Sequence, residues 1–345
     1  MTAATPTATD EGAYADRLQA AFAEVCASVG SVRHDLEFGG RAVRLEVAGR
    51  ALADRLVPAL AHLRAPTPHA APEFTVQAWD RHGTGRPAPP PPWGIDRYGP
   101  REQIVGLDPA RLRASYELAS GILSLHRPGS AVATFYAADA ATIPRWVARM
   151  PFRRLLGWFA EDAGLTFAHA SVVGRDGACV LLPGNSGSGK STTALACAEA
   201  GFDFLGDDLC LIDPDALIAH AAYGRAKAEA DAVARVPALA ARVLATEAGQ
   251  SLIEPPNLVS RARIVGIALP AITGEPATST RPARPSEAVF ALAPSTLVEG
   301  NGAGQVSLAT LARIAGQLPV AHLQLGTDMA GVVAAVDELI ARWSP

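Results

Sequence analysis

A glycine-rich segment at residues 184–191 limits the possible folds more than any other feature of the chain. It reads GNSGSGKS and matches the pattern G-x-x-x-x-G-K-[ST] in full. An apolar run precedes the segment and an alanine-rich run follows it, which is the strand–loop–helix context in which such a loop binds phosphate. The order of elements around it predicts an α/β sheet with parallel pairing.

Each residue type in this segment has its own role in binding a nucleoside triphosphate. The glycines let the backbone turn tightly, so that successive N–H groups point toward phosphate oxygens. Lys190 supplies a positive charge for the β- and γ-phosphates, and the Ser191 hydroxyl is a suitable ligand for Mg²⁺. The sequence therefore predicts ATP and Mg²⁺ as ligands. The predicted nucleotide-binding residues are Gly184, Asn185, Ser186, Gly187, Ser188, Gly189, Lys190, Ser191 and Thr192.

Two adjacent carboxylates, Asp207 and Asp208, follow a short strand-like run downstream of the glycine-rich segment. A phosphotransferase needs one carboxylate near the loop for the metal, and a second can take the proton of the acceptor hydroxyl. Neighbouring side chains of a strand point in opposite directions, which suits two different roles. A solvated Asp-Asp turn is the alternative. His169 lies near the strand that precedes the loop. By itself it would have no predicted role, and it gains one only together with the loop and the two aspartates.

Residues 167–212 resemble the nucleotide-binding domain of the HPr serine kinase/phosphorylase family and its shorter relatives. The resemblance depends on His169-Ala170-Ser171, the loop at 184–191 and Gly206-Asp207-Asp208, in that order. It implies a P-loop kinase domain whose architecture is shared with the phosphoenolpyruvate carboxykinase nucleotide site.

The later segments 292–298 and 318–326 look like the C-terminal part of HPr-kinase-like proteins that occur beside peptide-modifying enzymes. Some of those relatives phosphorylate a serine on a ribosomal peptide precursor. The resemblance therefore implies a kinase that transfers the γ-phosphate of ATP to a serine-type hydroxyl of a peptide or protein.

The resemblance also implies roles for single residues. Asp207 is assigned as the catalytic base and Asp208, with Ser191, as a metal ligand, while His169 positions or polarises the acceptor hydroxyl beside Lys190. A Glu-x-Arg-Gly-rich segment that the family carries after the Asp-Asp strand is missing here, so the reverse phosphorylase activity is not implied.

Arg225 and Lys227 stand in place of that missing segment. They are candidates for contact with the γ-phosphate or the acceptor. The alternative is that both charges lie on the exposed start of a helix.

Three other functions remain to be weighed against a peptide or protein kinase. A small-molecule kinase would use the same loop and the same two aspartates. A non-catalytic nucleotide-binding module would need neither Asp207, Asp208 nor His169. An ABC-type ATPase is disfavoured because no LSGGQ-like segment follows the loop.

The length of 345 residues predicts two domains. We expect a smaller α+β domain at residues 1–150, with a substrate-binding or regulatory role, and the kinase domain at residues 151–345. Helices are predicted at 14–29, 50–64, 142–163, 228–248 and 328–343, and a Pro/Gly-rich loop at 83–100. Strands are predicted at 43–47, 73–79, 111–118, 121–126, 130–137, 167–173, 178–182, 202–205, 209–212, 264–269 and 320–325.

Composition narrows the partners and the compartment. The net charge of −4 and the pI of about 6.1 argue against binding to nucleic acid or to an anionic membrane. No apolar run is long enough to span a membrane, and the N-terminus lacks the features of a signal peptide. The four cysteines form no C-x-x-C pair. We therefore expect a cytoplasmic protein, and the sequence does not indicate its oligomeric state.

Overall fold

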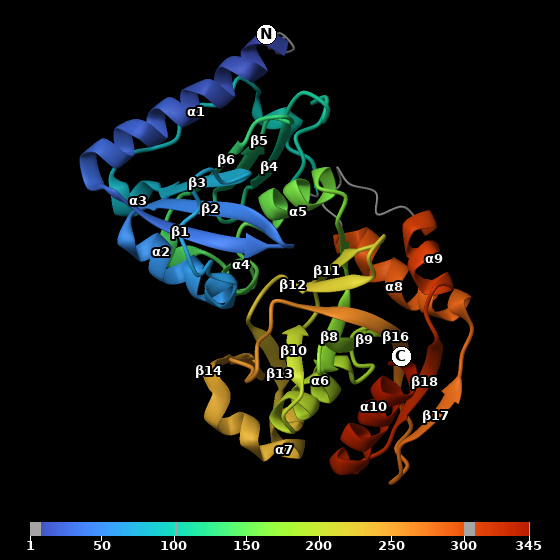
Figure 1. The fold of residues 1–345 in the computed structure, drawn as a ribbon. Helices are drawn as coiled ribbons and strands as arrows, with labels where there is room; N and C mark the ends of the chain where they lie inside the picture. The colour runs from blue at the N-terminus through green and yellow to red at the C-terminus, as the bar shows by residue number, and fades with distance from the viewer. Residues whose placement is uncertain (1–7, 101, 300–307, 345) are drawn as a thin grey trace. The chain divides into compact units, whose positions relative to one another are not determined.

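The computed structural model describes residues 8–100, 102–299 and 308–344, and the chain forms two compact units (Figure 1). The first unit extends to Phe159 and the second begins at Ala160. This division lies inside helix α5 (Arg153–Asp162), whereas the sequence predicts a boundary just before that helix, at residue 150.

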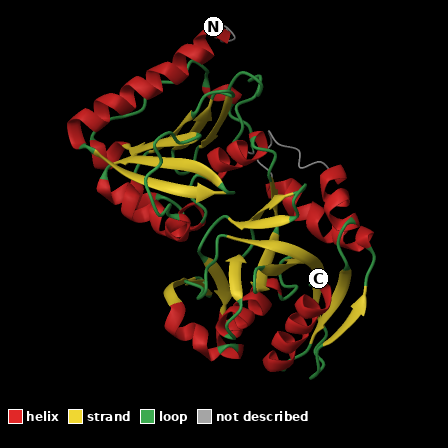
Figure 2. Cartoon of the chain, viewed as in Figure 1, coloured by secondary structure: helices red, strands yellow, loops and turns green. Residues whose placement is uncertain are grey.

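The first unit is built on one mixed sheet (Figure 2), to which six strands of the described residues contribute in the order β1-β2-β3-β6-β5-β4. The three central strands β2, β3 and β6 are parallel, and the outer strands pair antiparallel with their neighbours. The strands are β1 (Ser31–Phe38), β2 (Arg41–Ala48), β3 (Phe74–Asp80), β4 (Arg113–Glu117), β5 (Ile122–His126) and β6 (Val132–Ala137).

Aromatic side chains hold helices to both faces of this sheet. Side chains alternate along β3, so Phe74 and Trp79 point to opposite faces. Trp79 contacts Phe22 of helix α1, with ring centroids 5.9 Å apart, and Phe74 stacks on Phe159 of α5 at 4.8 Å. The helices of this unit are α1 (Ala8–Val29), α2 (Arg50–Leu56), α3 (Arg81–Thr84), α4 (Arg145–Arg149) and the first part of α5, with 3-10 turns η1 (Val57–Leu63), η2 (Ile95–Arg97) and η3 (Ala140–Thr142).

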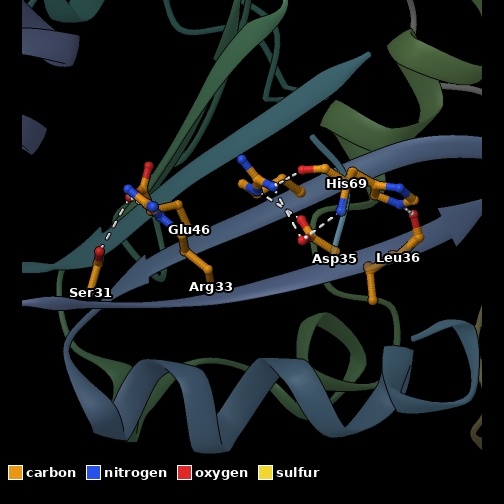
Figure 3. Close-up of polar contacts among 7 residues, drawn as sticks. Ser31, Arg33, Asp35, Leu36, Glu46 and His69 are labelled. Carbon is orange, nitrogen blue, oxygen red and sulfur yellow. Dashed lines mark hydrogen bonds and ion pairs between the residues drawn. The ribbon is translucent and has the colours of Figure 1, made fainter. Parts of the chain in front are cut away.

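The β1–β2 hairpin is joined to the following loop by a charged network (Figure 3). Asp35 accepts hydrogen bonds from Arg44 Nε at 2.7 Å and from the His69 backbone N–H at 3.1 Å. At the other end of the hairpin, Glu46 accepts from Arg33 Nε at 3.0 Å. These contacts fix a hairpin and a loop, and they bring together no group with an obvious chemical role.

The second unit contains a larger mixed sheet, in which the described strands follow the order β10-β8-β9-β16-β12-β11-β7, with β18 beside β16 and β17 beside β18. Its strands are β7 (Thr166–Ala168), β8 (Ala170–Arg175), β9 (Ala178–Pro183), β10 (Asp203–Gly206), β11 (Cys210–Asp213), β12 (Ile218–Ala221), β16 (Arg261–Ile272), β17 (Ser279–Pro282) and β18 (Val320–Leu325). A small separate sheet has the order β13-β15-β14, from β13 (Ala226–Glu229), β14 (Val243–Glu247) and β15 (Gln250–Ile253).

The directions of these strands determine where the site is built. Strand β16 is parallel to both β9 and β18. Strand β8 is antiparallel to β9 and β10 is antiparallel to β8, so β10 runs in the same direction as β9. Consequently the carboxyl ends of β9, β10, β16 and β18 and the first residue of β8 all lie at one edge of the sheet.

Small aliphatic side chains form most of the core of the second unit. Helices α6 (Lys190–Glu199) and α10 (Met329–Trp343) pack together with β8, β9 and β16, and helix α8 (Pro285–Glu299) contacts β16, β9 and β7 and packs with α9 (Leu308–Gly316). Within the described ranges, no helix combines the length and the apolar character that a membrane span requires.

Several predicted elements differ from the structure. The predicted helix 142–163 is interrupted between α4 and α5, because Pro151 cannot donate a backbone hydrogen bond and Phe152 takes a positive φ of 57°. Thr142, the first residue of that predicted helix, lies in η3 instead. The predicted helix 228–248 is also wrong: only α7 (Ala230–Arg235) is helical, followed by the 3-10 turn η4 (Pro237–Arg242) and by β14.

Candidate active site

The glycine-rich loop connects β9 to α6 at the edge of the sheet described above. Gly189 has φ 96°, and a Cβ placed on it would lie 2.4 Å from Leu325 Cδ1. A Cβ on Gly184 would lie 2.7 Å from Ser188 Oγ. Gly184 also has a positive φ, of 152°. Both positions therefore need glycine, for their backbone conformation and for the close approach of neighbouring atoms.

Two polar groups of the loop lack the partners that burial normally requires. The buried Ser188 Oγ makes no hydrogen bond within the described residues. Lys190 is only 5% exposed, and its Nζ donates to the Asn185 carbonyl at 3.4 Å without a carboxylate partner among those residues. A buried cation at the start of a helix suits an anionic ligand, since the helix N-terminus also presents free N–H groups. These residues fit a phosphate chain.

Asp207 is fixed by hydrogen bonds to both of its carboxylate oxygens. Oδ1 accepts from Ser191 Oγ at 2.7 Å and from Ser171 Oγ at 2.9 Å, and Oδ2 accepts from the Lys227 backbone N–H at 3.1 Å. The side chain is 4% exposed. Strand β10 brings Asp207 to the loop, the beginning of β8 supplies Ser171, and β13 supplies the backbone of Lys227.

Asp208 lies in different surroundings, although it is the next residue. Its φ of 65° is in the left-handed region, and the turn is closed by a hydrogen bond from the Leu209 N–H to the Asp207 carbonyl. Its Oδ2 lies 3.1 Å from Lys227 Nζ and its Oδ1 lies 4.0 Å from His169 Nε2. The left-handed turn thus directs the two neighbouring carboxylates to different partners.

The other predicted residues do not all lie beside the aspartates. His169 and Lys227 contact Asp208, and Thr192 follows Ser191 in the first turn of α6. Arg225 forms an ion pair with Glu254 instead of joining the aspartates. Asn185, Ser186 and Gly187 form the exposed part of the loop.

One member of the cluster, Ser171, received no role from the sequence. It is fully buried on β8 and reaches Asp207. Its position one residue beyond Ala170 in the His169-Ala170-Ser171 segment was the only signal, and a serine inside an apolar strand is not distinctive by itself.

The donor set at Asp207 fits Mg²⁺ better than a transition metal. The donors there are oxygen atoms of a carboxylate and a hydroxyl, whereas transition metals favour nitrogen and sulfur ligands. Mg²⁺ is commonly held by one or two carboxylates together with substrate phosphates and water. Ser191 and Asp207, which touch each other beside the loop, provide such a partial set.

Comparison with known proteins adds little to this geometry. No protein-family model matches the chain, and no curated protein matches its sequence. Among solved structures, the Hpr(Ser) kinase/phosphatase from Coxiella burnetii aligns at 14% identity with a TM-score of 0.25, over 51% of this chain and 95% of that chain. The TM-score is too low to support any assignment, so the function is argued from the site itself.

Proposed function

We propose that the chain transfers the γ-phosphate of a nucleoside triphosphate to a hydroxyl group. The observation that carries this proposal is the convergence of a buried lysine, a serine hydroxyl and two buried carboxylates at one sheet edge beside a glycine loop. Phosphoryl transfer needs these components: charge to offset the transferring group, a metal position and a proton acceptor.

Asp207 and Ser191 are the proposed metal ligands, which reverses the roles expected from the sequence. Ser191 Oγ lies 2.7 Å from Asp207 Oδ1, and among the described residues no such contact joins Ser191 to Asp208. A metal bound there would offset the negative charge of the phosphates. Because Ser171 and the Lys227 N–H also bond to Asp207, the carboxylate is held in place before any ligand arrives.

Asp208 is the proposed general base. It lies beside His169, which can orient the acceptor hydroxyl, and Lys227 Nζ can move from Asp208 to a phosphate oxygen because its side chain is 37% exposed. In the step, the acceptor oxygen forms a bond to the γ-phosphorus while the bond to the β,γ-bridging oxygen breaks. The nucleoside diphosphate leaves and the acceptor proton passes to Asp208.

A serine of a peptide or protein is the proposed acceptor, and this part rests on the sequence resemblance alone. The test is transfer from γ-labelled ATP with Mg²⁺ to serine peptides and, separately, to small hydroxyl compounds. Lys190→Ala should lower transfer by about 10³-fold, since one electrostatic contact to the transition state is worth about that much. Arg342→Ala, an exposed site in the same unit, is the control.

The outcomes separate the candidate functions. Label on a serine peptide supports the full proposal, and label only on a small compound makes the chain a metabolite kinase. Nucleotide binding without transfer to any hydroxyl would make it a binding module, and full activity in Lys190→Ala would contradict the site.

A magnesium titration tests the assignment of the two aspartates. We expect Asp207→Asn to raise the Mg²⁺ concentration at half-maximal rate by about tenfold, because a neutral amide binds a hard cation more weakly than a carboxylate does. Asp208→Asn should leave that concentration unchanged. The opposite pattern would restore the roles expected from the sequence.

A further inference from the structure

The first unit has a small hollow that is lined by its sheet and by helices α4 and α5. Its volume is about 30 Å³, which is room for about two water molecules. Ser115 and Glu117 of β4 and Ser124 of β5 line it on the sheet side, and Trp146 of α4 lines it on the helix side. A space of this size fits the end of a side chain or of a small ligand.

We propose that this hollow, the ammonium pocket, binds a primary ammonium group at the end of an alkyl chain. A free alkylamine and a lysine side chain of a peptide both carry such a group. The inference goes beyond the proposed phosphotransfer and does not rest on it, because none of the groups proposed for that reaction lies in the first unit.

Two buried serine hydroxyls on the sheet side of the pocket lack hydrogen-bond partners. Ser115 and Ser124 are directly opposite each other in the pairing of β4 with β5, and they are 6% and 4% exposed. Within the described ranges, no group forms a hydrogen bond with either hydroxyl. Buried polar groups are normally paired, so two unpaired hydroxyls in one pocket point to a ligand that pairs with them.

The carboxylate of Glu117 gives the pocket a negative charge without a cation beside it. Glu117 is two residues from Ser115 along β4, so both side chains point to the same face of the sheet. Its Oε2 accepts from Ser120 Oγ at 2.6 Å, and no ion pair joins it to another described residue. Burial raises the pKa of Glu117, and the nearby Glu102 adds to this effect. A bound cation would offset the cost of burying this charge.

The two arginines of the pocket already have partners. Arg154 forms an ion pair with Glu102 at 2.9 Å, and Arg153 has contacts of its own. An anion in the pocket would also lie close to the Glu117 carboxylate, which would repel it. These contacts favour a cation over an anion.

The other groups of the pocket suit the shape of an alkylammonium ion. An ammonium group has three N–H donors, and the Glu117 carboxylate and the hydroxyls of Ser115 and Ser124 provide three acceptors. Trp146 is 43% exposed, and its ring can attract a cation or pack against the alkyl chain. Met150 adds apolar surface for the methylene groups.

Backbone strain also concentrates around the pocket. In the described part of the first unit, the residues other than glycine with a positive φ are Glu102 at 66° and Phe152 at 57°, and both line the pocket. Such conformations are unfavourable and occur most often at ligand-binding and active sites.

The test is an NMR titration of the whole chain with the N-acetylated, C-amidated peptide Ala-Lys-Ala and, separately, with n-butylammonium chloride. We expect both to bind, and the same peptide with norleucine in place of lysine to bind about tenfold more weakly or less, because it lacks the charged donor. Glu117→Gln keeps the shape of the side chain and should weaken binding of both ligands by about tenfold. Glu24→Gln changes an exposed carboxylate on α1 of the same unit and should leave both affinities unchanged.

A second variant tests the pocket even if Glu117→Gln does not fold. Because the Ser124 hydroxyl has no partner within the described ranges, Ser124→Ala should not lower the melting temperature of the free protein. It should nevertheless weaken binding of n-butylammonium by about tenfold, since one hydrogen bond to a charged group is lost.

The outcomes separate the two sources of the ammonium group and can overturn the inference. Binding of n-butylammonium alone would make a free amine the ligand, binding of the lysine peptide alone would make it a peptide side chain, and both results support the pocket. Failure of both to bind, equal measurable affinity for the lysine and norleucine peptides, or unchanged affinity in Ser124→Ala would overturn it. So would equal affinity for n-butyltrimethylammonium, which has the charge without the N–H donors. No nucleotide is present in this measurement, so its result is independent of the proposed phosphotransfer.

Discussion

Each unit buries an aspartate at or just beyond the carboxyl end of a strand, and the two carboxylates are used differently. In the first unit, Asp80 ends β3 and is 1% exposed, and its Oδ2 accepts from the backbone N–H groups of Gly83 at 2.7 Å and Ala140 at 3.3 Å. In the second unit, Asp208 follows β10 and is 3% exposed, and its partners include the side chains of Lys227 and His169.

The difference gives a reason, beyond burial alone, to propose Asp208 and not Asp80 as the reactive carboxylate. Backbone N–H groups are fixed by the fold, so a carboxylate bonded to them stabilises a turn and has little freedom to exchange protons with a substrate. Side-chain partners such as a lysine can move to a ligand and release the carboxylate. Asp208 also has a left-handed backbone conformation, which is unfavourable for a residue other than glycine and persists because the surrounding structure stabilises it.

The largest effect that would sharpen this comparison is expected from Asp208→Asn. Loss of a general base should lower kcat by about 10²–10⁴-fold, while thermal stability should change little because asparagine tolerates a left-handed backbone. The measurement is steady-state transfer together with a melting curve. Asp176→Asn is the matched control, since Asp176 is exposed in the same unit and also has a positive φ of 52°.

A different pattern would break the comparison. If Asp208→Asn kept its kcat, or if it lost activity only through unfolding, Asp208 would be a structural residue like Asp80.

A smaller effect is expected from Asp80→Ala, and on stability instead of turnover. Removing the carboxylate leaves two backbone N–H groups without their acceptor and should cost about 1–2 kcal/mol. For a unit of this size, the melting temperature should fall by about 2–8 °C. Asp139→Ala, which removes the cap of η3 at a less buried site, should cost less. A kcat that fell as much in Asp80→Ala as in Asp208→Asn would contradict the distinction.

Much of the second unit was predictable because its motifs constrain the backbone strongly. The glycine spacing with Lys190 and Ser191 predicts a strand, a loop and a helix, and these are β9, the loop and α6. The predicted strand 320–325 is β18 without change. Regular spacing of apolar residues and the residue types of one loop were sufficient to predict these elements.

The geometry of the aspartates was not predictable, because it depends on the backbone and on distant segments. A strand would point Asp207 and Asp208 to opposite sides, but the left-handed φ of Asp208 creates a turn, which the sequence offered only as a solvated alternative. Lys227 approaches from β13, whose last two residues were predicted to begin the helix 228–248. Pairing with β15 outweighs that helical preference, and this pairing is a long-range contact.

The smallest expected effect concerns the reactivity of the cysteine thiols, which differs between the two units. Burial raises the pKa of the Cys197 and Cys210 thiols to about 12 and that of Cys179 still further, and all three lie in the second unit. Cys26 of the first unit is only partly buried, and its pKa is raised less, chiefly by burial. Because the thiolate is the reactive form, iodoacetamide should modify Cys26 alone in the folded protein, and faster as the pH rises.

Mass spectrometry should therefore find one adduct in the native protein, four in guanidinium chloride and none in native Cys26→Ser. Modification of Cys26 should leave transfer and melting temperature unchanged, since no residue of the candidate active site lies in the first unit. Native labelling of Cys197 at the rate of Cys26 would mean that α6, the helix that begins with Lys190, opens readily. The loop would then lack the rigid support on which the preorganised phosphate site depends.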